Sequence, residues 1–393
     1  MKIPVGYSFA AASASFKKPG KLDLAAIVSR TPAVAAGVFT TNKFKAAPVL
    51  QCKEMLADGR RMSGFLVNSG QANACTGEEG RANCRETLNL AARALGVPPD
   101  ELLPASTGVI GAQFDMRKWA DVMPALSESF GKAAPENAAR AIMTTDTVHK
   151  LAESSFELKG GEVRLLGLCK GAGMISPNMA TMLCFVTCDA DISAEAWQVM
   201  LSDCVNLTIN RVTVDGDMST NDCVMALANG ESGVAIESED DYVLLRKHLL
   251  SVLEELAYKI VMDAEGGTKV AFIEVSGARD DADAEKVARA VGNSPLVKTA
   301  LFGSDPNWGR IICAAGYSGA NFKAEDLVLK IGGVLVFRNG TPEPGNMDDL
   351  LNPIMKKRDI VIHISVGEGP GSSMLLASDL SKEYVSINAD YRS

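Results

Sequence analysis

The sequence is poor in histidine, the commonest general base for a serine or cysteine nucleophile. Only three histidines, His149, His248 and His363, occur in 393 residues. His363 alternates within an apolar strand pattern and His248 lies in a leucine-rich helical pattern. Both patterns favour structural histidines over bases. A hydrolase built on a serine or cysteine with a histidine base is therefore disfavoured.

The nine cysteines form no CxxC pair and no short cysteine and histidine spacing of the kind that metal sites use. We therefore expect no bound metal. An odd number of scattered cysteines in a long chain is typical of buried free thiols in a reducing compartment. A disulfide-stapled scaffold is likewise disfavoured.

The chain also lacks an excess of positive charge, a long apolar run and a phosphate-binding motif. It carries 39 Lys and Arg against 48 Asp and Glu, a net charge of -9, which disfavours a nucleic-acid partner. No stretch approaches the ~20 apolar residues of a membrane span. Pro4, Gly6 and Ser8 interrupt the apolar region that a signal peptide needs. We expect a cytoplasmic protein that contacts neither nucleic acid nor membrane.

Hydrophobic residues make up 47% and charged residues 22% of the chain, as in ordinary globular proteins. Helical periodicity covers residues 82–95, 116–130, 194–205 and 242–261, and strand patterns cover 163–169, 182–188, 271–275, 328–337 and 359–366. Gly160 and Gly161 predict a hairpin turn before the first of these strands. Helices and strands do not alternate strictly, so a layered α+β architecture is favoured over a single doubly wound sheet.

One segment between two predicted strands resists an ordinary interpretation, residues 170–181 (KGAGMISPNMAT). Gly171 and Gly173 permit unusual backbone conformations, while Pro177 fixes its own φ and extends Ser176. A strand follows the segment, whereas phosphate-binding glycine loops open a helix. The composition therefore predicts a shaped loop with a chemical role.

Thr181 is a candidate nucleophile at the end of this segment. A threonine at a new chain start carries its own α-amine beside its hydroxyl, with a reference pKa of ~7.7 to 8.0, and so brings its own base. Ala180 is small, which leaves its carbonyl open to attack by the Thr181 hydroxyl and to cleavage of the chain there. From the residues alone, an ordinary strand that begins at Thr181 is the favoured interpretation.

Several further motifs, together with the segment above, resemble the ornithine acetyltransferase (ArgJ) family over essentially the whole chain. They are residues 37–42 (GVFTTN), 68–77 (NSGQANACTG), 106–111 (STGVIG), 213–222 (TVDGDMSTND) and 304–310 (SDPNWGR). The resemblance implies a layered α/β/β/α sandwich of the ArgJ and DmpA kind. It also implies self-cleavage between Ala180 and Thr181 into an α chain (1–180) and a β chain (181–393), with Thr181 as nucleophile.

The resemblance carries roles onto further residues. Thr107 and Gly108 match the family's oxyanion donors. The family's substrate contacts match Lys170, Glu265, Asn388, Ser393 and either Thr144 or its neighbour Thr145. Taken without the family, Lys170 and Glu265 would pass for solvated surface charges, and the C-terminal tail for a frayed end.

Two departures from the family pattern concern the C-terminal region. Ser393 stands where many members end in threonine, a change that keeps the hydroxyl. Residues 376–380 read LASDL where many members have Trp-Gly-Cys-Asp-Leu, which leaves the local packing open.

The implied reaction moves the acetyl group of N2-acetylornithine to glutamate through an acetyl-Thr181 intermediate, in arginine biosynthesis. The resemblance implies no metal and no prosthetic group, and it leaves open acetyl-CoA as a second donor. The α and β chains would associate as an α2β2 heterotetramer or a larger assembly. Two alternatives remain: a self-processing amidohydrolase or aminopeptidase of the same fold, and a non-catalytic amino-acid-binding protein.

Overall fold

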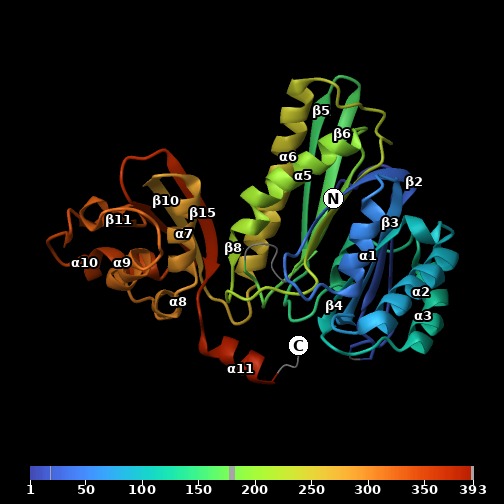
Figure 1. Cartoon of the computed structure of the whole chain (residues 1–393), viewed down its shortest axis with the longest axis horizontal. Helices are drawn as coiled ribbons and strands as arrows, with labels where there is room; N and C mark the ends of the chain where they lie inside the picture. Colours follow the sequence, from blue (N-terminus) through green and yellow to red (C-terminus); the bar gives the residue numbers. More distant parts are fainter. Residues whose placement is uncertain (18, 177–181, 391–393) are drawn as a thin grey trace.

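The structure, a computed structural model, describes residues 1–17, 19–176 and 182–390. Its strands form two mixed sheets. Figure 1 shows the first sheet with its helices on the right and the second sheet with its helices on the left. The predicted mixture of helices and strands, without strict alternation, is confirmed.

The first sheet has the strand order β4-β3-β2-β9-β7-β6-β5, and β1 pairs with β2. Its strands are β1 (Tyr7–Ala12), β2 (Leu24–Phe39), β3 (Met62–Gln71), β4 (Leu102–Val109), β5 (Lys150–Leu158), β6 (Gly161–Lys170), β7 (Leu183–Cys188) and β9 (Cys223–Ala228). Its helices are α1 (Ala47–Leu56), α2 (Gly77–Leu95), α3 (Met116–Ser129), α4 (Pro135–Ala141), α5 (Ala194–Leu207) and α6 (Glu239–Met262).

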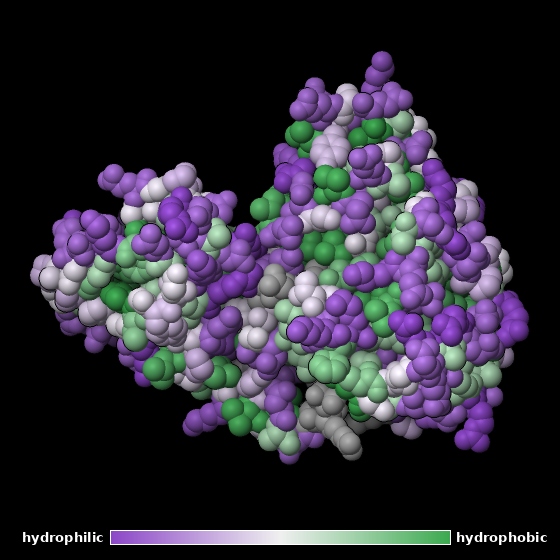
Figure 2. All heavy atoms as spheres, in the orientation of Figure 1, coloured by the Kyte–Doolittle hydropathy of each residue, from purple (hydrophilic) through white to green (hydrophobic). Residues whose placement is uncertain are grey.

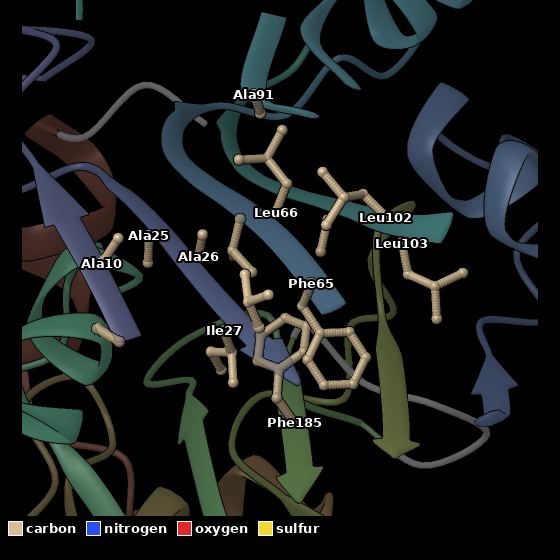
Figure 3. Close-up of a cluster of buried hydrophobic side chains, with 14 of the residues drawn as sticks. Ala10, Ala25, Ala26, Ile27, Phe65, Leu66, Ala91, Leu102, Leu103 and Phe185 are labelled. Carbon is tan, nitrogen blue, oxygen red and sulfur yellow. The ribbon is translucent and has the colours of Figure 1, made fainter. Parts of the chain in front are cut away.

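The long strand β2 takes part in both layers of this sheet. Its first half pairs with β1 and β3, its second half pairs with β9, and the register shifts between Val28 and Ala33. The layer of β3 then packs on the layer of β7. Phe65 of β3 and Phe185 of β7 meet between them, with ring centroids 5.1 Å apart (Figure 3).

Helices cover the outer faces of the two layers. Leu66, the neighbour of Phe65, points the other way along β3 and packs towards Ala91 of α2 (Figure 3). On β7, Phe185 belongs to the core between the layers, whereas Val186 belongs to the core beneath α5 and α6. This order of helix, strand layer, strand layer and helix is the predicted α/β/β/α sandwich.

The second sheet has the strand order β13-β12-β11-β14-β10-β15-β8. Its strands are β8 (Val212–Thr213), β10 (Val270–Ala278), β11 (Val328–Ile331), β12 (Val334–Arg338), β13 (Thr341–Pro342), β14 (Asp359–Ser365) and β15 (Gly371–Ser378). The helices after β9 and α6 are α7 (Asp281–Gly292), α8 (Pro295–Phe302), α9 (Trp308–Gly316), α10 (Met347–Met355) and α11 (Lys382–Asp390). A separate core joins one face of this sheet to α7, α8 and α9.

Two local expectations were wrong. The single strand predicted over residues 328–337 is a hairpin, because Gly332 and Gly333 both take positive φ and turn β11 into β12. The tail that would pass for a frayed end is the helix α11. The hairpin turn at Gly160 and Gly161 is confirmed between β5 and β6.

The remaining side-chain expectations are mostly confirmed. His248 stacks on Phe156, and His363 lies 3.3 Å from the Ser276 hydroxyl, so both have structural contacts. All nine cysteines are free. Seven of them are buried, as expected, whereas Cys75 and Cys313 are exposed.

The 376–378 departure from the family pattern is buried in β15. There the Ser378 carbonyl accepts a hydrogen bond from the Lys298 ammonium. Figure 2 shows polar residues over most of one face, with smaller apolar patches between them. No helix among the described residues is long and apolar enough to cross a membrane.

Candidate active site

Most of the residues singled out from the sequence meet in one pocket. Thr107, Gly108, Thr144, Thr145, Lys170, Glu265 and Asn388 all line it, together with Ala72, Ile110, Gly173, Met174 and residues 219–221. The pocket opens to solvent, and its cavity measures about 70 Å³. Ala180, Thr181 and Ser393 lie outside the described residues.

The candidate oxyanion donors stand at the end of β4. Gly108 has a φ of +132°, and a Cβ there would lie 2.3 Å from the carbonyl carbon of Gly70, so glycine is required. Asn221 holds this strand end in place, since its side-chain amide donates to the carbonyls of Ala72 (2.6 Å) and Ser106 (2.8 Å). The Thr107 hydroxyl and the Gly108 amide are thereby fixed at the pocket wall.

Lys170 is the last residue of β6 and is 2% exposed, so it is not a solvated surface charge. Its ammonium donates to the Thr107 hydroxyl oxygen at 3.3 Å. Burial lowers the pKa of Lys170, and Asp146 opposes that shift. The residue thus places a buried cation beside a candidate oxyanion donor.

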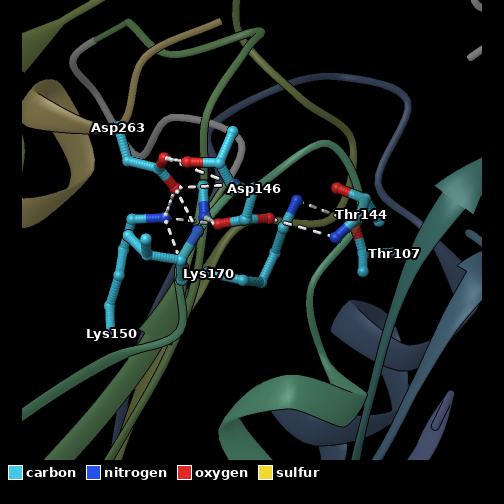
Figure 4. A network of polar contacts seen from close by, with 9 residues as sticks. Thr107, Thr144, Asp146, Lys150, Lys170 and Asp263 are labelled. Carbon is cyan, nitrogen blue, oxygen red and sulfur yellow. Dashed lines mark hydrogen bonds and ion pairs between the residues drawn. The ribbon is translucent and has the colours of Figure 1, made fainter. Parts of the chain in front are cut away.

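A buried ionic network holds the loop around Thr144 against the end of β6 (Figure 4). Asp146 accepts hydrogen bonds from the backbone amides of Thr144 (3.0 Å) and Gly171 (2.7 Å). Lys150 lies between two carboxylates, 2.6 Å from Asp146 and 2.5 Å from Asp263. The network therefore connects the loop around Thr144, the turn that follows Lys170 and the segment that leads to Glu265.

The ionisation of this network follows from its contacts. Burial alone would raise the pKa of Asp146, but Lys170, Lys150 and two hydrogen bonds outweigh it and lower the pKa to about 2. Burial would lower the pKa of Lys150, but Asp146, Cys169 and Asp263 more than offset it, and the pKa is raised. Asp146 and Lys150 are therefore both charged near neutral pH, and they form an ion pair.

We expect Lys150→Met to destabilise the protein by about 3–5 kcal/mol, because it leaves two buried carboxylates without their cation. Lys159→Met, an exposed lysine on the same hairpin, should change the free energy of unfolding by less than about 0.5 kcal/mol. Urea denaturation followed by circular dichroism measures both. Equal stabilities of the two variants would show that the network contributes nothing.

Glu265 is 8% exposed, follows α6, and lines the same pocket as Lys170. Its carboxylate accepts a hydrogen bond from the side-chain amide of Asn388 on α11 at 2.7 Å. A Cβ at Gly173 would lie 2.3 Å from the same carboxylate, so a larger residue there would displace the Glu265 side chain from this position. The contact gives the C-terminal helix its place at the pocket.

The segment after Lys170 is held in shape by Asp215. Met174 takes a positive φ of 57°, and Asp215 accepts the backbone amides of Met174 (2.6 Å) and Ile175 (2.9 Å). The Tyr384 hydroxyl of α11 donates to the same carboxylate at 3.2 Å. The segment is thus shaped by an outside partner, and its positive φ belongs to Met174 rather than to Gly173, contrary to the expectation from the glycines.

Sequence reasoning assigned no role to Asp146, Lys150, Asp215, Asn221 or Asp263. Asp215 and Asn221 stand in the motif of residues 213–222 (TVDGDMSTND), and Asp146 stands two residues after Thr144. These positions in or beside residues already singled out were the available signal for them. The contact of Lys150 with Asp263 had no such signal, because it joins residues 113 positions apart. Between residues 1 and 390, the described residues form no cluster of His, Cys, Asp or Glu that could hold a metal ion.

Comparisons with known proteins identify the relatives of this chain. Residues 8–393 match the model of the ArgJ family. A curated relative named arginine biosynthesis bifunctional protein ArgJ, from Nitratidesulfovibrio vulgaris, is 56% identical over 390 residues and covers 99% of both chains. A relative of the same name from Geobacter sulfurreducens is 44% identical over 98% of this chain and 99% of its own.

A solved structure supports the same relationship. The crystal structure of arginine biosynthesis bifunctional protein argJ from Bacillus halodurans is 38% identical, with a TM-score of 0.51. It covers 53% of this chain and 98% of the solved chain. The family model and the relatives span nearly every described element, so the chain belongs to the ArgJ family.

Proposed function

We propose that this protein transfers the acetyl group of N2-acetylornithine to glutamate, through an acetyl-Thr181 intermediate, after cutting itself between Ala180 and Thr181. One observation carries the proposal. The pocket gathers the candidate oxyanion donors and the candidate substrate contacts at the end of β6, and β6 pairs there with the start of β7 through Lys170 and Leu183. Thr181 lies two residues before Leu183 in the chain.

Each step of the proposed reaction uses a residue of the pocket. The Thr181 hydroxyl attacks the acetyl carbonyl, and its own α-amine takes the proton. Thr107 and Gly108 donate to the oxyanion of the tetrahedral intermediate. The intermediate collapses, and ornithine leaves with the proton on its amine. The amine of glutamate then attacks acetyl-Thr181 by the same route in reverse.

One pocket can serve both amino acids because they share an α-carboxylate. The ammonium of Lys170 pairs with that carboxylate, and Glu265 receives the side-chain ammonium of acetylornithine. No metal or prosthetic group takes part in this scheme. The relatives are named bifunctional, and on that ground we include acetyl-CoA as a second donor. We place the reaction in the cytoplasm.

The fold explains how two fragments would remain one enzyme after cleavage. Strands β7 and β9 follow position 181, and the sheet places them between β2 and β6, which precede it. The α chain (1–180) and the β chain (181–393) therefore share one sheet through backbone hydrogen bonds on both sides. We expect them to copurify under native conditions, and we extend the proposal to an α2β2 heterotetramer.

Glu265→Gln is expected to raise KM for acetylornithine by roughly 10- to 100-fold, because it removes one charge-assisted contact worth about 1.5–3 kcal/mol. The amide keeps the shape of the side chain and can still accept from Asn388. Glu383→Gln, the same change at an exposed site on α11, is the matched control. Steady-state kinetics that give both variants the wild-type KM would remove Glu265 from substrate binding.

The dependence of deacetylation on glutamate tests the transfer itself. Cleaved protein is incubated with acetylornithine, with and without glutamate, and ornithine and acetylglutamate are quantified. The proposal predicts sustained ornithine release only with glutamate, and equal amounts of acetylglutamate. Sustained release without glutamate, with free acetate as product, would instead identify a hydrolase.

A further inference from the structure

Self-cleavage needs a proton acceptor that the proposed acyl transfer does not supply. Before the chain is cut, the nitrogen of Thr181 belongs to a peptide bond, and an amide nitrogen is no base at neutral pH. The Thr181 hydroxyl must nevertheless lose its proton as it attacks the Ala180 carbonyl. Another group must therefore take that proton in the uncut chain, and this inference rests on the self-cleavage proposed above.

Asp222 is placed beside Met182, the residue that follows Thr181 in the chain, by the pairing of two strands. It directly precedes β9, which runs parallel to β7 with Leu183 opposite Cys223. One carboxylate oxygen, Oδ1, accepts the backbone amide of Met182 at 3.0 Å, and the amide of Cys223 donates to the Met182 carbonyl at 3.2 Å. These contacts anchor the carboxylate to the residue that follows Thr181.

The second oxygen of the same carboxylate, Oδ2, is fully buried and has no hydrogen-bond partner among the described residues. A buried, unpartnered carboxylate oxygen is costly and rare in folded proteins. The other oxygen is already used by Met182, so the contact with the strand does not explain Oδ2. The side chain is built to meet a further group.

Covalent geometry limits which atoms that further group can be. The nitrogens of Thr181 and Met182 are joined by three bonds, of about 1.46, 1.52 and 1.33 Å, and so lie within about 4 Å of each other. The Asp222 oxygen that accepts from the Met182 amide at 3.0 Å is therefore within about 7 Å of the Thr181 nitrogen. The distance holds for any conformation of the chain before Met182.

We propose that Asp222 is the general base of self-cleavage. Its carboxylate takes the proton of the Thr181 hydroxyl while the oxygen bonds to the Ala180 carbonyl carbon. The bond from that carbon to the Thr181 nitrogen then breaks, and Asp222 returns the proton to this nitrogen, which becomes the free α-amine. Water hydrolyses the resulting ester, giving the Ala180 carboxylate and restoring the Thr181 hydroxyl.

The electrostatic environment suits a base. Burial raises the pKa of Asp222 well above its usual range, although the Met182 amide, Lys170 and the nearby Ser219 oppose the shift. A carboxylate with a raised pKa binds a proton more readily than an ordinary one. The titratable groups that face it are Lys170 at the end of β6 and the thiol of Cys223 on its own strand.

Asp222→Asn tests the proposal, because the amide keeps the shape and the acceptor for Met182 but cannot take a proton. The precursor is made by cell-free translation, transferred to buffers from acid to alkaline pH, and its conversion from the 41.5 kDa chain is timed by intact-mass analysis. We expect cleavage to slow by roughly 10²- to 10⁴-fold. The wild-type rate should rise with pH through one ionisation, and that rise should vanish in the variant.

Controls separate this base from a purely structural carboxylate. Cys223→Ala disturbs the same buried site without touching the carboxylate, and should keep the wild-type pH profile. Asp222→Glu, which keeps the carboxylate, should cleave faster than Asp222→Asn and retain the rise with pH. Cleavage of Asp222→Asn at the wild-type rate, or with the wild-type pH profile, would overturn the proposal. A wild-type chain that never cleaves would instead overturn the proposed function.

Discussion

The Thr181→Ala variant is expected to remain a single chain of 41.5 kDa and to transfer no measurable acetyl group. The change removes the hydroxyl that attacks the Ala180 carbonyl, so the α-amine is never released. It also removes the oxygen that would carry the acetyl group. Both functions are lost together because one atom serves both, and intact-mass analysis with an acetyl-transfer assay measures them side by side.

Thr181→Ser is the matched control for that variant. Serine keeps the hydroxyl, and it would also provide an α-amine once cleaved, so we expect both activities to persist at a reduced rate. A Thr181→Ala variant that still splits at position 180, or that transfers acetyl groups as an intact chain, would place the nucleophile elsewhere.

Thr107→Val should lower kcat by roughly 10²- to 10³-fold with little change in KM, as expected for loss of one oxyanion donor. Valine keeps the branched shape, and the side chain is only 4% exposed, so the main change is the lost hydroxyl. Its oxygen also accepts from the Lys170 ammonium at 3.3 Å. Steady-state kinetics on cleaved protein measure the effect.

Thr107→Ser keeps the hydroxyl and should stay within about tenfold of the wild type, since each tenfold is only about 1.4 kcal/mol. A similar loss of kcat in both variants would point to packing of the methyl group instead. A rise in KM with unchanged kcat would make Thr107 a substrate contact rather than an oxyanion donor.

Much of the layered fold could be predicted from local patterns. The strand at 163–169 and the helix capped by Ser193 depend on neighbours in sequence, and both are present, the latter with the Ser193 hydroxyl accepting the Ala196 amide. The hairpin within 328–337 was missed because an apolar run hides the two glycines. The folding of β2 across both layers depends on partners far along the chain, which no local pattern carries.

The residues of the candidate site were predicted less completely than the fold. Lys170 and Glu265 were named through the family resemblance, while their charge alone suggested surface positions. In the buried site, Lys170 donates to Thr107 with the charge of Asp146 nearby, and Glu265 accepts from Asn388, so their partners come from distant elements. The ionic network around Lys150 and the orphan oxygen of Asp222 become visible only when strands far apart in sequence are side by side.

Trapping of the acyl enzyme tests whether Thr181 carries the acetyl group. Cleaved protein is mixed with N2-acetylornithine in the absence of glutamate, quenched in acid at short times, and the 181–393 fragment is analysed by mass spectrometry. We expect one acetyl group on that fragment, located at Thr181 and discharged when glutamate is added. An unmodified fragment, in a preparation that turns over when glutamate is present, would contradict this expectation.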